Sequence, residues 1–484
     1  MKKTLAFLLM AVMLISLIAC DTTPSESLPS ESTPATDVSD ETSTEVSEEF
    51  KYEYPAIDLE KDDIIFVVPN SQYSYYESFE IFAAELKDEV INDAVFNRNA
   101  IVESKLNCYI LEDKQFAIHE IVKTNFNSGI DDYDVYMPMM NDSITLAADG
   151  YLADLTTLEG INLDGEWWDQ RANKDLTLNG KLYFSTGDIS ILDNECTMVM
   201  FFNKTLISQN DLENPYDLVK SHKWTIDKVY EMSKEFTADN GDGKWNNQDK
   251  YGLHVAFNAP HSFFFGGGGR MSENDGENVT ITLGNEAFTN MIDDIMEISL
   301  STSVVTNNHA GCTTFENICD MFTNNQIIFT TFALTDMRQF RNAKNFDFGI
   351  LPYPHYSEDQ TEYNCLISTS LVPGVCFLDG FETTDNAAIV VDAMAYESME
   401  TLTDAYYDKT LTLRDLRDEE SGEMLDIIFS SRVYDIGYIC NWGGMGKIFE
   451  DMYSAKQNNF TSKFDGMKTA IDSAMEDTMM RFKD

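Results

Sequence analysis

The sequence predicts an α/β fold built on a parallel sheet. Short apolar runs at 64–68, 108–111 and 134–138 alternate with longer stretches that have helical spacing. Strands that alternate with helices are typical of βαβ units, in which the strands run parallel. Ligands of such sheets bind beyond the carboxyl ends of the strands. The loops that follow the first and third runs are therefore candidate site loops.

The length of 484 residues is too great for one core and predicts two or more folded units. Further strands are expected at 326–332 and 346–352, and helices at 224–236 and 293–300. A β stretch from 180 to 204 is long enough to carry the chain from one unit into another. From about residue 386 the sequence is mostly helical in pattern.

The chain is strongly acidic, with 83 Asp and Glu against 33 Lys and Arg and a formal charge of −50. Such a chain repels nucleic acid and anionic lipid surfaces, so we expect no nucleic-acid partner. The charge favours a neutral or cationic ligand over an anionic one.

The first twenty residues have the parts of a secretory signal. Lys2 and Lys3 precede an apolar run from Leu5 to Ile18, and small Ala19 stands directly before Cys20. The run is shorter than the roughly 20 residues that a spanning helix needs. A cysteine at this place is similar to the lipobox of bacterial lipoproteins. The resemblance implies a signal peptide at 1–19, a diacylglycerol on Cys20 and a position on the outer face of the cell membrane. An ordinary signal peptide or an uncleaved anchor are the alternatives.

The segment from 20 to 55 predicts a disordered acidic tether. Residues 21–50 are rich in Ser, Thr, Glu, Asp and Pro, contain no Lys or Arg and have few apolar residues with which to form a core.

The seven other cysteines do not form a disulfide framework, because their number is odd and they are scattered. Most lie in apolar surroundings and are expected to be small buried side chains. A Cys312–Cys319 disulfide remains open because the two are near in sequence. No C-x-x-C or H-E-x-x-H pattern occurs, which argues against zinc.

The stretch 238–249 is similar to a calcium-binding loop with a glycine at its sharp turn. The predicted Ca²⁺ ligands are Asn240, Asp242, the Lys244 carbonyl, Asn246 and Asp249. Two positions depart from the pattern, since Ala238 stands at the first ligand and an Asp replaces the final Glu. A polar turn without metal is the alternative. We expect a structural Ca²⁺ at most, and no other cofactor.

Aromatic residues beside glycines mark two further candidate positions. Phe263 and Phe264 precede Gly266–Gly269, which predicts a loop at the edge of a cleft, or alternatively core packing next to a turn. Trp442 stands before two glycines in a loop between helices and could be a platform for a ligand. No nucleophile elbow, Walker loop or dinucleotide fingerprint occurs.

The order of short motifs resembles that of the extracellular solute-binding proteins of ABC importers, family 1, the carbohydrate-type group related to maltose-binding protein. The motifs that carry the resemblance are 133–136, 150–155, 179–184, 202–204, 224–225, 240–252, 417–429 and 441–444. The last two are similar to a lipoprotein subgroup of Gram-positive bacteria. The resemblance covers nearly all of 60–484.

The resemblance implies a two-lobed periplasmic-binding-protein-like fold of type II, with a ligand cleft between lobes joined by crossing strands. The first lobe would comprise 60–189 and 333–367, and the second 190–332 and 368–484. The crossings would fall near 190–194, 331–333 and 367–370.

The resemblance also implies where a ligand binds. The site-forming positions of the family correspond here to the loop after the first strand, the loop at 139–142, the first crossing, the segment 258–265 and the residues after Thr331. With the platform above, the predicted ligand-binding residues are Asn70, Tyr73, Tyr75, Tyr76, Asn141, Asp142, Asp193, Glu195, Phe263, Phe264, Phe332 and Trp442.

The expected function is capture of a sugar or oligosaccharide and its delivery to the permease subunits of an ABC importer, by a monomeric protein that is not an enzyme. The alternative ligand is an oligopeptide or another small polar solute. A cell-surface glycoside hydrolase and an adhesin are the alternatives from other classes.

Overall fold

The computed structural model describes residues 52–71, 76–301, 304–305, 309–344, 346–381, 383–407 and 418–483. From Tyr52 onward the chain forms one compact unit. The predicted signal peptide, Cys20 and the tether up to residue 51 lie outside the described residues, as do Tyr73 and Tyr75.

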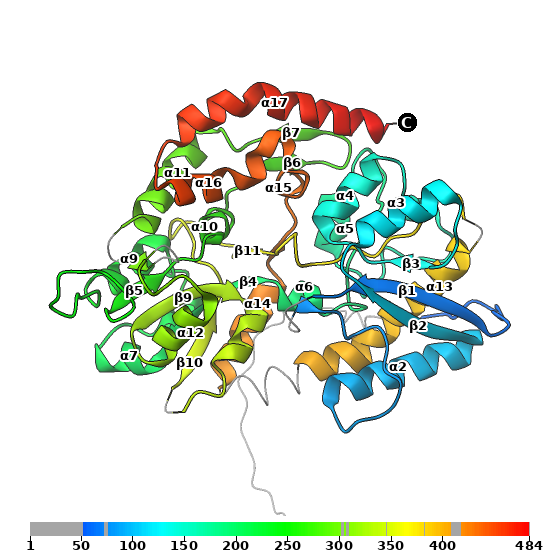
Figure 1. Ribbon diagram of the computed structural model, residues 1–484, viewed down its shortest axis with the longest axis horizontal. Coiled ribbons are helices and arrows are strands. Elements are labelled where there is room, and N and C mark those ends of the chain that lie inside the picture. The colour runs from blue at the N-terminus through cyan, green and yellow to red at the C-terminus, as the bar shows by residue number, and fades with distance from the viewer. Residues whose placement is uncertain are drawn as a thin grey trace, which may run out of the picture. The chain divides into compact units, whose positions relative to one another are not determined.

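The strands and helices alternate through most of the unit (Figure 1). The strands are β1 (Asp62–Pro69), β2 (Cys108–Gln115), β3 (Val135–Tyr136), β4 (Met198–Asn203), β5 (Tyr251–His254), β6 (Ser272–Asn274), β7 (Val279–Ile281), β8 (Val304–Val305), β9 (Ile327–Ala333), β10 (Phe348–Leu351), β11 (Cys365–Leu366) and β12 (Arg432–Val433). The α-helices are α2 (Val90–Leu106), α3 (Ile118–Ser128), α4 (Met140–Ala148), α5 (Gln170–Leu176), α6 (Leu192–Glu195), α7 (Lys204–Gln209), α8 (Pro215–Lys220), α9 (Ile226–Lys234), α10 (Ala259–Gly266), α11 (Glu286–Ser299), α12 (Phe315–Thr323), α13 (Thr384–Ser398), α14 (Glu419–Phe429), α15 (Ile436–Cys440), α16 (Ile448–Ala455) and α17 (Phe460–Arg481). Short 3₁₀ and π segments are η2 (Leu155–Thr157), η3 (Leu334–Gln339), η4 (Met399–Thr403) and η6 (Trp442–Lys447).

The first lobe is built on a parallel sheet with the strand order β2-β1-β3. In β1, Ile64 and the run Phe66–Val68 are buried, and such apolar side chains favour a strand that is covered on both faces. Helices α2 and α13 lie on one face of this sheet, and α3 and α4 lie on the other (Figure 1).

The second lobe is built on a five-stranded sheet with the order β10-β4-β9-β5-β8. Strands β5, β8 and β9 are parallel, and β4 is antiparallel to both β9 and β10. The predicted β stretch from 180 to 204 is shorter in the structure, where only β4 is a strand.

The predicted division of the chain between the lobes is wrong for two segments. Strand β10 pairs with β4, so it belongs to the second lobe, although 333–367 was assigned to the first. Conversely, residues 373–378 form bridges with Tyr136, Leu152 and Ser185 of the first lobe, and α13 packs against α2. Backbone pairing between segments far apart in sequence determines which lobe each of the two segments joins. A local sequence pattern does not predict such pairing.

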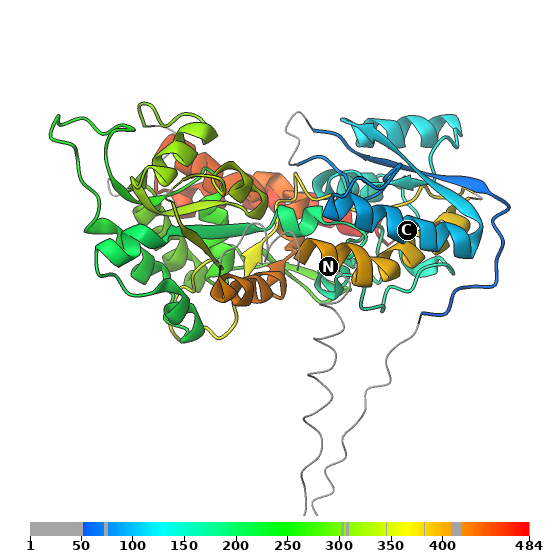
Figure 2. The same ribbon diagram turned by 90° about the horizontal axis from the view of Figure 1, so that it is seen from below.

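Three segments run together between the lobes. The backbone N–H of Leu334 donates to the carbonyl of Thr197, and that of Ser368 donates to Cys196. Helix α6 leads directly into β4 and lies between the two sheets (Figure 2). We refer to residues 192–197 as the first crossing segment.

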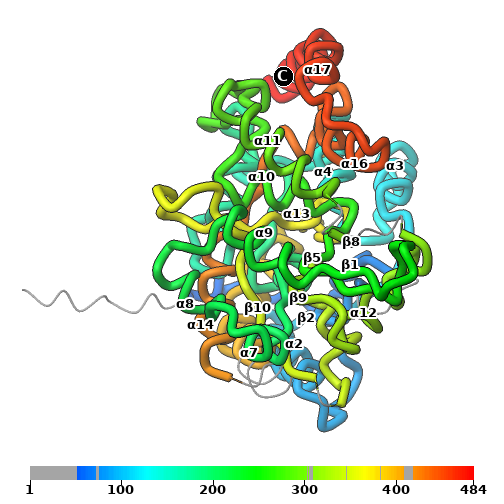
Figure 3. The backbone as a smooth tube through the Cα atoms, turned by 90° about the vertical axis from the view of Figure 1, so that its left-hand side faces the viewer, coloured from blue at the N-terminus to red at the C-terminus, as the bar shows by residue number. Residues whose placement is uncertain are grey.

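The C-terminal helix α17 contacts both lobes. Its first half packs on α11 and α16 along one edge of the unit (Figure 3). At its other end, Arg481 forms a 2.8 Å ion pair with Asp149, and the ring of Phe482 lies 5.1 Å from that of Tyr183 in the first lobe.

The seven cysteines of the described part are free, and all except Cys440 are buried. This agrees with the prediction of small buried side chains. The Cys312–Cys319 disulfide that the sequence left open is not formed, and the Cys312 sulfur instead lies 3.6 Å from the Met321 sulfur.

Candidate functional site

The carboxyl ends of the parallel strands of both sheets lead into segments that contact each other. In the first lobe, the chain beyond β1 reaches Tyr76, whose hydroxyl donates to Asp336 at 3.0 Å. Asp336 lies in η3, directly beyond β9 of the second lobe. The strand-end edges of the two sheets therefore meet, and we call the segments beyond these ends the ligand-side edges. In α/β proteins such edges carry the ligand.

Polar side chains gather on the ligand-side edge of the first lobe. Asn70 follows β1, and Asn141 and Asp142 open helix α4 beyond β3. Asn141 is exposed, Asn70 and Asp142 are partly exposed, and Asp142 lies 3.3 Å from the Nδ1 atom of His119. These predicted residues are accessible to a ligand, and their oxygens and amides can bond hydroxyl groups.

Two exposed aromatic residues stand on these edges, one in each lobe. Phe116 follows β2 and is 72 % exposed, and Phe257 follows β5 and is 53 % exposed. Sequence reasoning missed both. The sequence signal for both is a single phenylalanine just beyond the end of a strand, where the side chain no longer packs into the core.

Four predicted aromatic ligand contacts lie in the core instead. Phe263 and Phe264 are buried in α10, so the predicted loop is a helix. Its first turn holds Pro260, which is pre-set for a helix start, and every residue of the helix is buried. Phe332 packs in β9 against Phe315, and the Trp442 indole N–H donates to Thr478 of α17. A ligand cannot stack on these rings in this structure.

Asp193 and Glu195 both lie in α6 and are buried, each paired with an arginine. Glu195 accepts a 2.7 Å bond from Arg338, whose guanidinium lies 5.8 Å from the centre of the Phe79 ring. Asp193 is 3.2 Å from Arg432. Burial raises the pKa of Asp193 to about 7, although the charge of Arg432 opposes the shift. Burial likewise raises the pKa of Asp336 to about 7.

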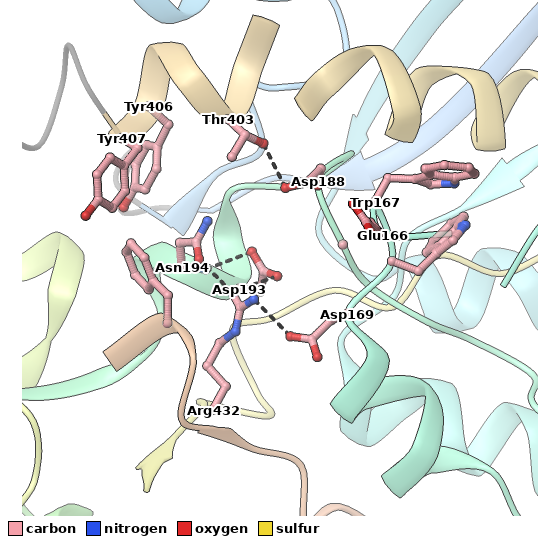
Figure 4. Close-up of a pocket in the computed structure, with 13 residues that line it drawn as sticks. Glu166, Trp167, Asp169, Asp188, Asp193, Asn194, Thr403, Tyr406, Tyr407 and Arg432 are labelled. Atoms are coloured by element: carbon pink, nitrogen blue, oxygen red, sulfur yellow. Dashed lines mark hydrogen bonds and ion pairs between the residues drawn. The ribbon is translucent and has the colours of Figure 1, made fainter. Parts of the chain in front are cut away.

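A cavity of about 190 Å³ lies beside the first crossing segment (Figure 4). We call it the hinge pocket. It is lined by Glu166, Trp167, Trp168, Asp169, Gly187, Asp188, Asp193, Asn194, Thr403, Tyr406, Tyr407, Phe429 and Arg432. Arg432 bonds Asp169, Asp193 and Asn194 within it, and the Thr403 hydroxyl donates to Asp188 at 2.8 Å.

The predicted calcium loop is closed by its own hydrogen bonds. The carboxylate of Asp249 accepts the backbone N–H groups of Asn240 at 2.9 Å and Asn246 at 2.7 Å, and Asp242 accepts that of Lys244 at 2.8 Å. Among the described residues, no group of three or more His, Cys, Asp or Glu side chains is placed to hold a metal ion. Calcium binding stays a prediction.

Within the described part of the chain, every helix is too short or too polar to cross a membrane.

Two α/β lobes, crossing segments between them and polar and aromatic groups on facing strand ends define a class of binding protein that holds a ligand between its lobes. The family model of the bacterial extracellular solute-binding proteins matches residues 117–391, more than half of the chain. The chain belongs to this family, which comprises extracellular solute-binding proteins and not enzymes.

Solved structures show the same fold. The maltose-binding protein MalE from Listeria monocytogenes, in complex with maltose, has a TM-score of 0.56 and 16 % identity over 86 % of this chain and 98 % of that one. An ABC substrate-binding protein from the same organism, in complex with cycloalternan, has a TM-score of 0.54 and 12 % identity over 87 % and 99 %. The GacH receptor of Streptomyces glaucescens, solved without ligand and with acarbose, has a TM-score of 0.52 and 15 % identity over 87 % and 98 %. No curated protein matches the chain in sequence. The predicted two-lobed type II fold is confirmed.

Proposed function

We propose that this chain captures a sugar or oligosaccharide between its lobes for an ABC importer. The observation that carries the proposal is the pair of exposed rings, Phe116 and Phe257, on the ligand-side edges of the two lobes. Sugar rings have apolar C–H faces that stack on aromatic rings, and exposed rings on both sides can contact one ligand from two directions.

Hydrogen-bonding groups beside the rings support the same ligand class. Asn70, Asn141 and Asp142 supply acceptors and amide donors for hydroxyl groups. The formal charge of −50 disfavours an anionic solute. The structural neighbours described above were solved with maltose, cycloalternan and acarbose, which are carbohydrate ligands of those proteins.

Calorimetric titration of the purified protein with maltose, maltotriose and maltotetraose tests this proposal. We expect micromolar binding of at least one sugar without turnover. A ligand that binds the native state also raises the melting temperature, so a thermal-shift screen of mono- and oligosaccharides extends the test. Melting that shifts with oligopeptides and with none of the sugars would contradict the carbohydrate proposal.

Variants separate ligand contact from folding. Phe116→Ala and Phe257→Ala should weaken sugar binding while the melting temperature stays within a few degrees. Tyr109→Ala is the matched control. Tyr109 is an exposed aromatic residue at the start of β2, whereas Phe116 follows the end of that strand. Equal loss of affinity in all three variants would show that the strand ends are not the binding site.

We further propose that the protein is anchored through a lipid on Cys20 and delivers its ligand to membrane permease subunits. The apolar run before Cys20 supports the anchor. In a Gram-positive host, Cys20→Ser should release the protein into the medium and leave its sugar affinity unchanged. Retention of this variant in the membrane fraction would contradict lipid anchoring.

A further inference from the structure

Arg432 connects three parts of the molecule through one guanidinium group. It lies 2.9 Å from Asp169, 3.2 Å from Asp193 and 2.6 Å from the Asn194 side-chain oxygen. Figure 4 shows its side chain reaching from its strand toward all three. We call these four residues the hinge network. Among the described residues that line the hinge pocket, Arg432 alone is basic.

The four residues of the hinge network come from three parts of the fold. Arg432 lies in β12, which pairs with β11 close to where the chain leaves the second lobe. Asp169 belongs to the first lobe, where its other role is to cap α5 by accepting the N–H groups of Arg171 and Ala172. Asp193 and Asn194 lie in the first crossing segment. The hinge network therefore joins the C-terminal part of the chain, the first lobe and the crossing.

The geometry of the network makes it sensitive to the angle between the lobes. A guanidinium is a planar fork with fixed donor directions, so it satisfies several acceptors only in one arrangement. The side chains are also largely shielded from water, with 14 % exposure for Arg432, 7 % for Asp169 and 2 % for Asp193. Water therefore replaces few of these bonds when the lobes rotate. The Tyr434 hydroxyl adds a 2.8 Å bond to Asp169 from the strand side.

We infer that Arg432 is a positioning residue that holds the lobes at the angle seen in this structure and thereby determines ligand affinity from a distance. Lobes of a two-lobed binding protein move as rigid bodies about their crossing segments, and only differential stabilisation of one arrangement shifts the equilibrium. The hinge network makes more bonds at one angle than at others, so it provides that difference. The affinity part of the inference rests on the proposed sugar binding, whereas the angle part does not.

Distances between spin labels on the full chain, without sugar, test the angle directly. Labels at Tyr109→Cys in the first lobe and Trp245→Cys in the second lobe use two exposed positions. Protein without the added cysteines gives the background from the native cysteines, which include Cys20 and Cys440, the one cysteine of the described part that is not buried. We expect a narrow distance distribution that broadens or shifts in Arg432→Gln.

Three further variants make the result specific. Asp169→Asn retains the cap on α5 but removes the charge opposite Arg432, and it should reproduce the shift. Arg432→Lys retains the charge without the planar fork and should restore part of the wild-type distribution. Arg481→Gln is the matched control, because its exposed ion pair with Asp149 also joins the second lobe to the first. It should leave the distribution unchanged.

Sugar titration of the same variants completes the test. If the competent arrangement falls to about a tenth of the population, affinity falls roughly tenfold. A distribution that stays unchanged in well-folded Arg432→Gln and Asp169→Asn overturns the inference, as does lost affinity at an unchanged lobe distance. Should Arg432→Gln not fold, Arg432→Lys and Asp169→Asn decide alone. A shifted distribution in a protein that binds no sugar refutes the proposed function and leaves the positioning role intact.

Discussion

Helix α6 carries two buried carboxylates that lead to different regions of the molecule. Asp193 pairs with Arg432, whose partners lie in the first lobe and the crossing, on the side of the hinge pocket. Glu195 pairs with Arg338, which lies in η3 near the contact between Tyr76 and Asp336, on the ligand side. The residues are two positions apart and share burial and charge. The comparison teaches that the elements holding the arginine, and not the ion pair itself, determine what each pair does.

The largest expected difference between the two pairs is in stability. Arg432→Gln leaves the buried charges of Asp169 and Asp193 without their counter-ion, and breaking such a pair costs about 3–5 kcal/mol. Arg338 is more exposed, at 21 %, and one buried carboxylate, Glu195, loses its counter-ion instead of two, so its loss should cost less, about 2–3 kcal/mol. Urea unfolding of both variants measures the difference. Equal losses would mean that both pairs serve the same structural purpose.

The next largest effect is on ligand binding. On the ligand side, substitutions of residues that contact the sugar directly should lower affinity more than they lower stability. Removing the ring of Phe116 or Phe257 should weaken sugar binding by about 0.5–1.5 kcal/mol, since stacking on an aromatic ring contributes about this much. The free energy of unfolding should change by less than about 0.5 kcal/mol, as is usual for surface positions. Calorimetry and urea unfolding of each variant check the two values. A large loss of stability would place these rings in the core.

The pH dependence of stability should reflect two carboxylates whose pKa burial raises strongly, Asp193 and Asp336. The pKa values of Asp193 and Asp336 are raised to about 7, so both groups bind more protons in the folded than in the unfolded protein. Folding then becomes less favourable as the pH rises from about 4 to about 7, and the effect levels off above that range. The free energy of unfolding should therefore be larger at about pH 5.5 than at about pH 8.

Substitutions assign this dependence to its residues. Asp193→Asn and Asp336→Asn should each flatten the profile. Arg432→Gln should steepen it, because Asp193 is left facing Asp169 and Asp188 without a positive charge. Unfolding measured in urea across the pH range checks all three. A profile that Asp193→Asn leaves unchanged would show that other acids dominate it, such as the partly buried Glu112, whose pKa burial also raises to about 7.

The smallest effect is expected for the exposed pair between Arg481 and Asp149. The side chains are 46 % and 38 % exposed, and water and salt weaken such pairs. Arg481→Gln should lower the free energy of unfolding by about 0.5 kcal/mol or less. Thermal melting at low and high salt measures it. A loss comparable to that of Arg432→Gln would mean that α17, and not the hinge network, joins the lobes.

The sequence predicts the strands of this fold better than their partners. The runs that became β1, β9 and β10 are apolar and short, so their local pattern is sufficient. The prediction places β10 in the first lobe and 373–378 in the second, and the structure shows the reverse. Local pattern does not predict lobe membership, because strand pairing depends on segments far apart in sequence. The order of the short motifs nevertheless predicts the family correctly, because these motifs are spread over most of the chain.

The predicted ligand-binding residues divide in the same way. Polar residues such as Asn141 and Asp142 lie on an accessible strand-end edge, as their place after a strand and at the start of a helix predicts. Phe263 and Trp442 were misplaced because an aromatic residue beside glycines has the same local appearance in a core as at a cleft. Burial, which separates them from Phe116, depends on packing that the local sequence does not contain.

The return of the chain to the first lobe has a consequence for how the protein forms. Residues 373–378 and helix α13 complete a lobe that begins three hundred residues earlier, at β1. During synthesis, the first lobe lacks this part until all five strands of the second lobe's sheet have been made. Contacts between such distant segments slow folding and keep the early chain open. A late-closing lobe suits a protein of an extracellular family, because the chain stays loose until most of it has been made.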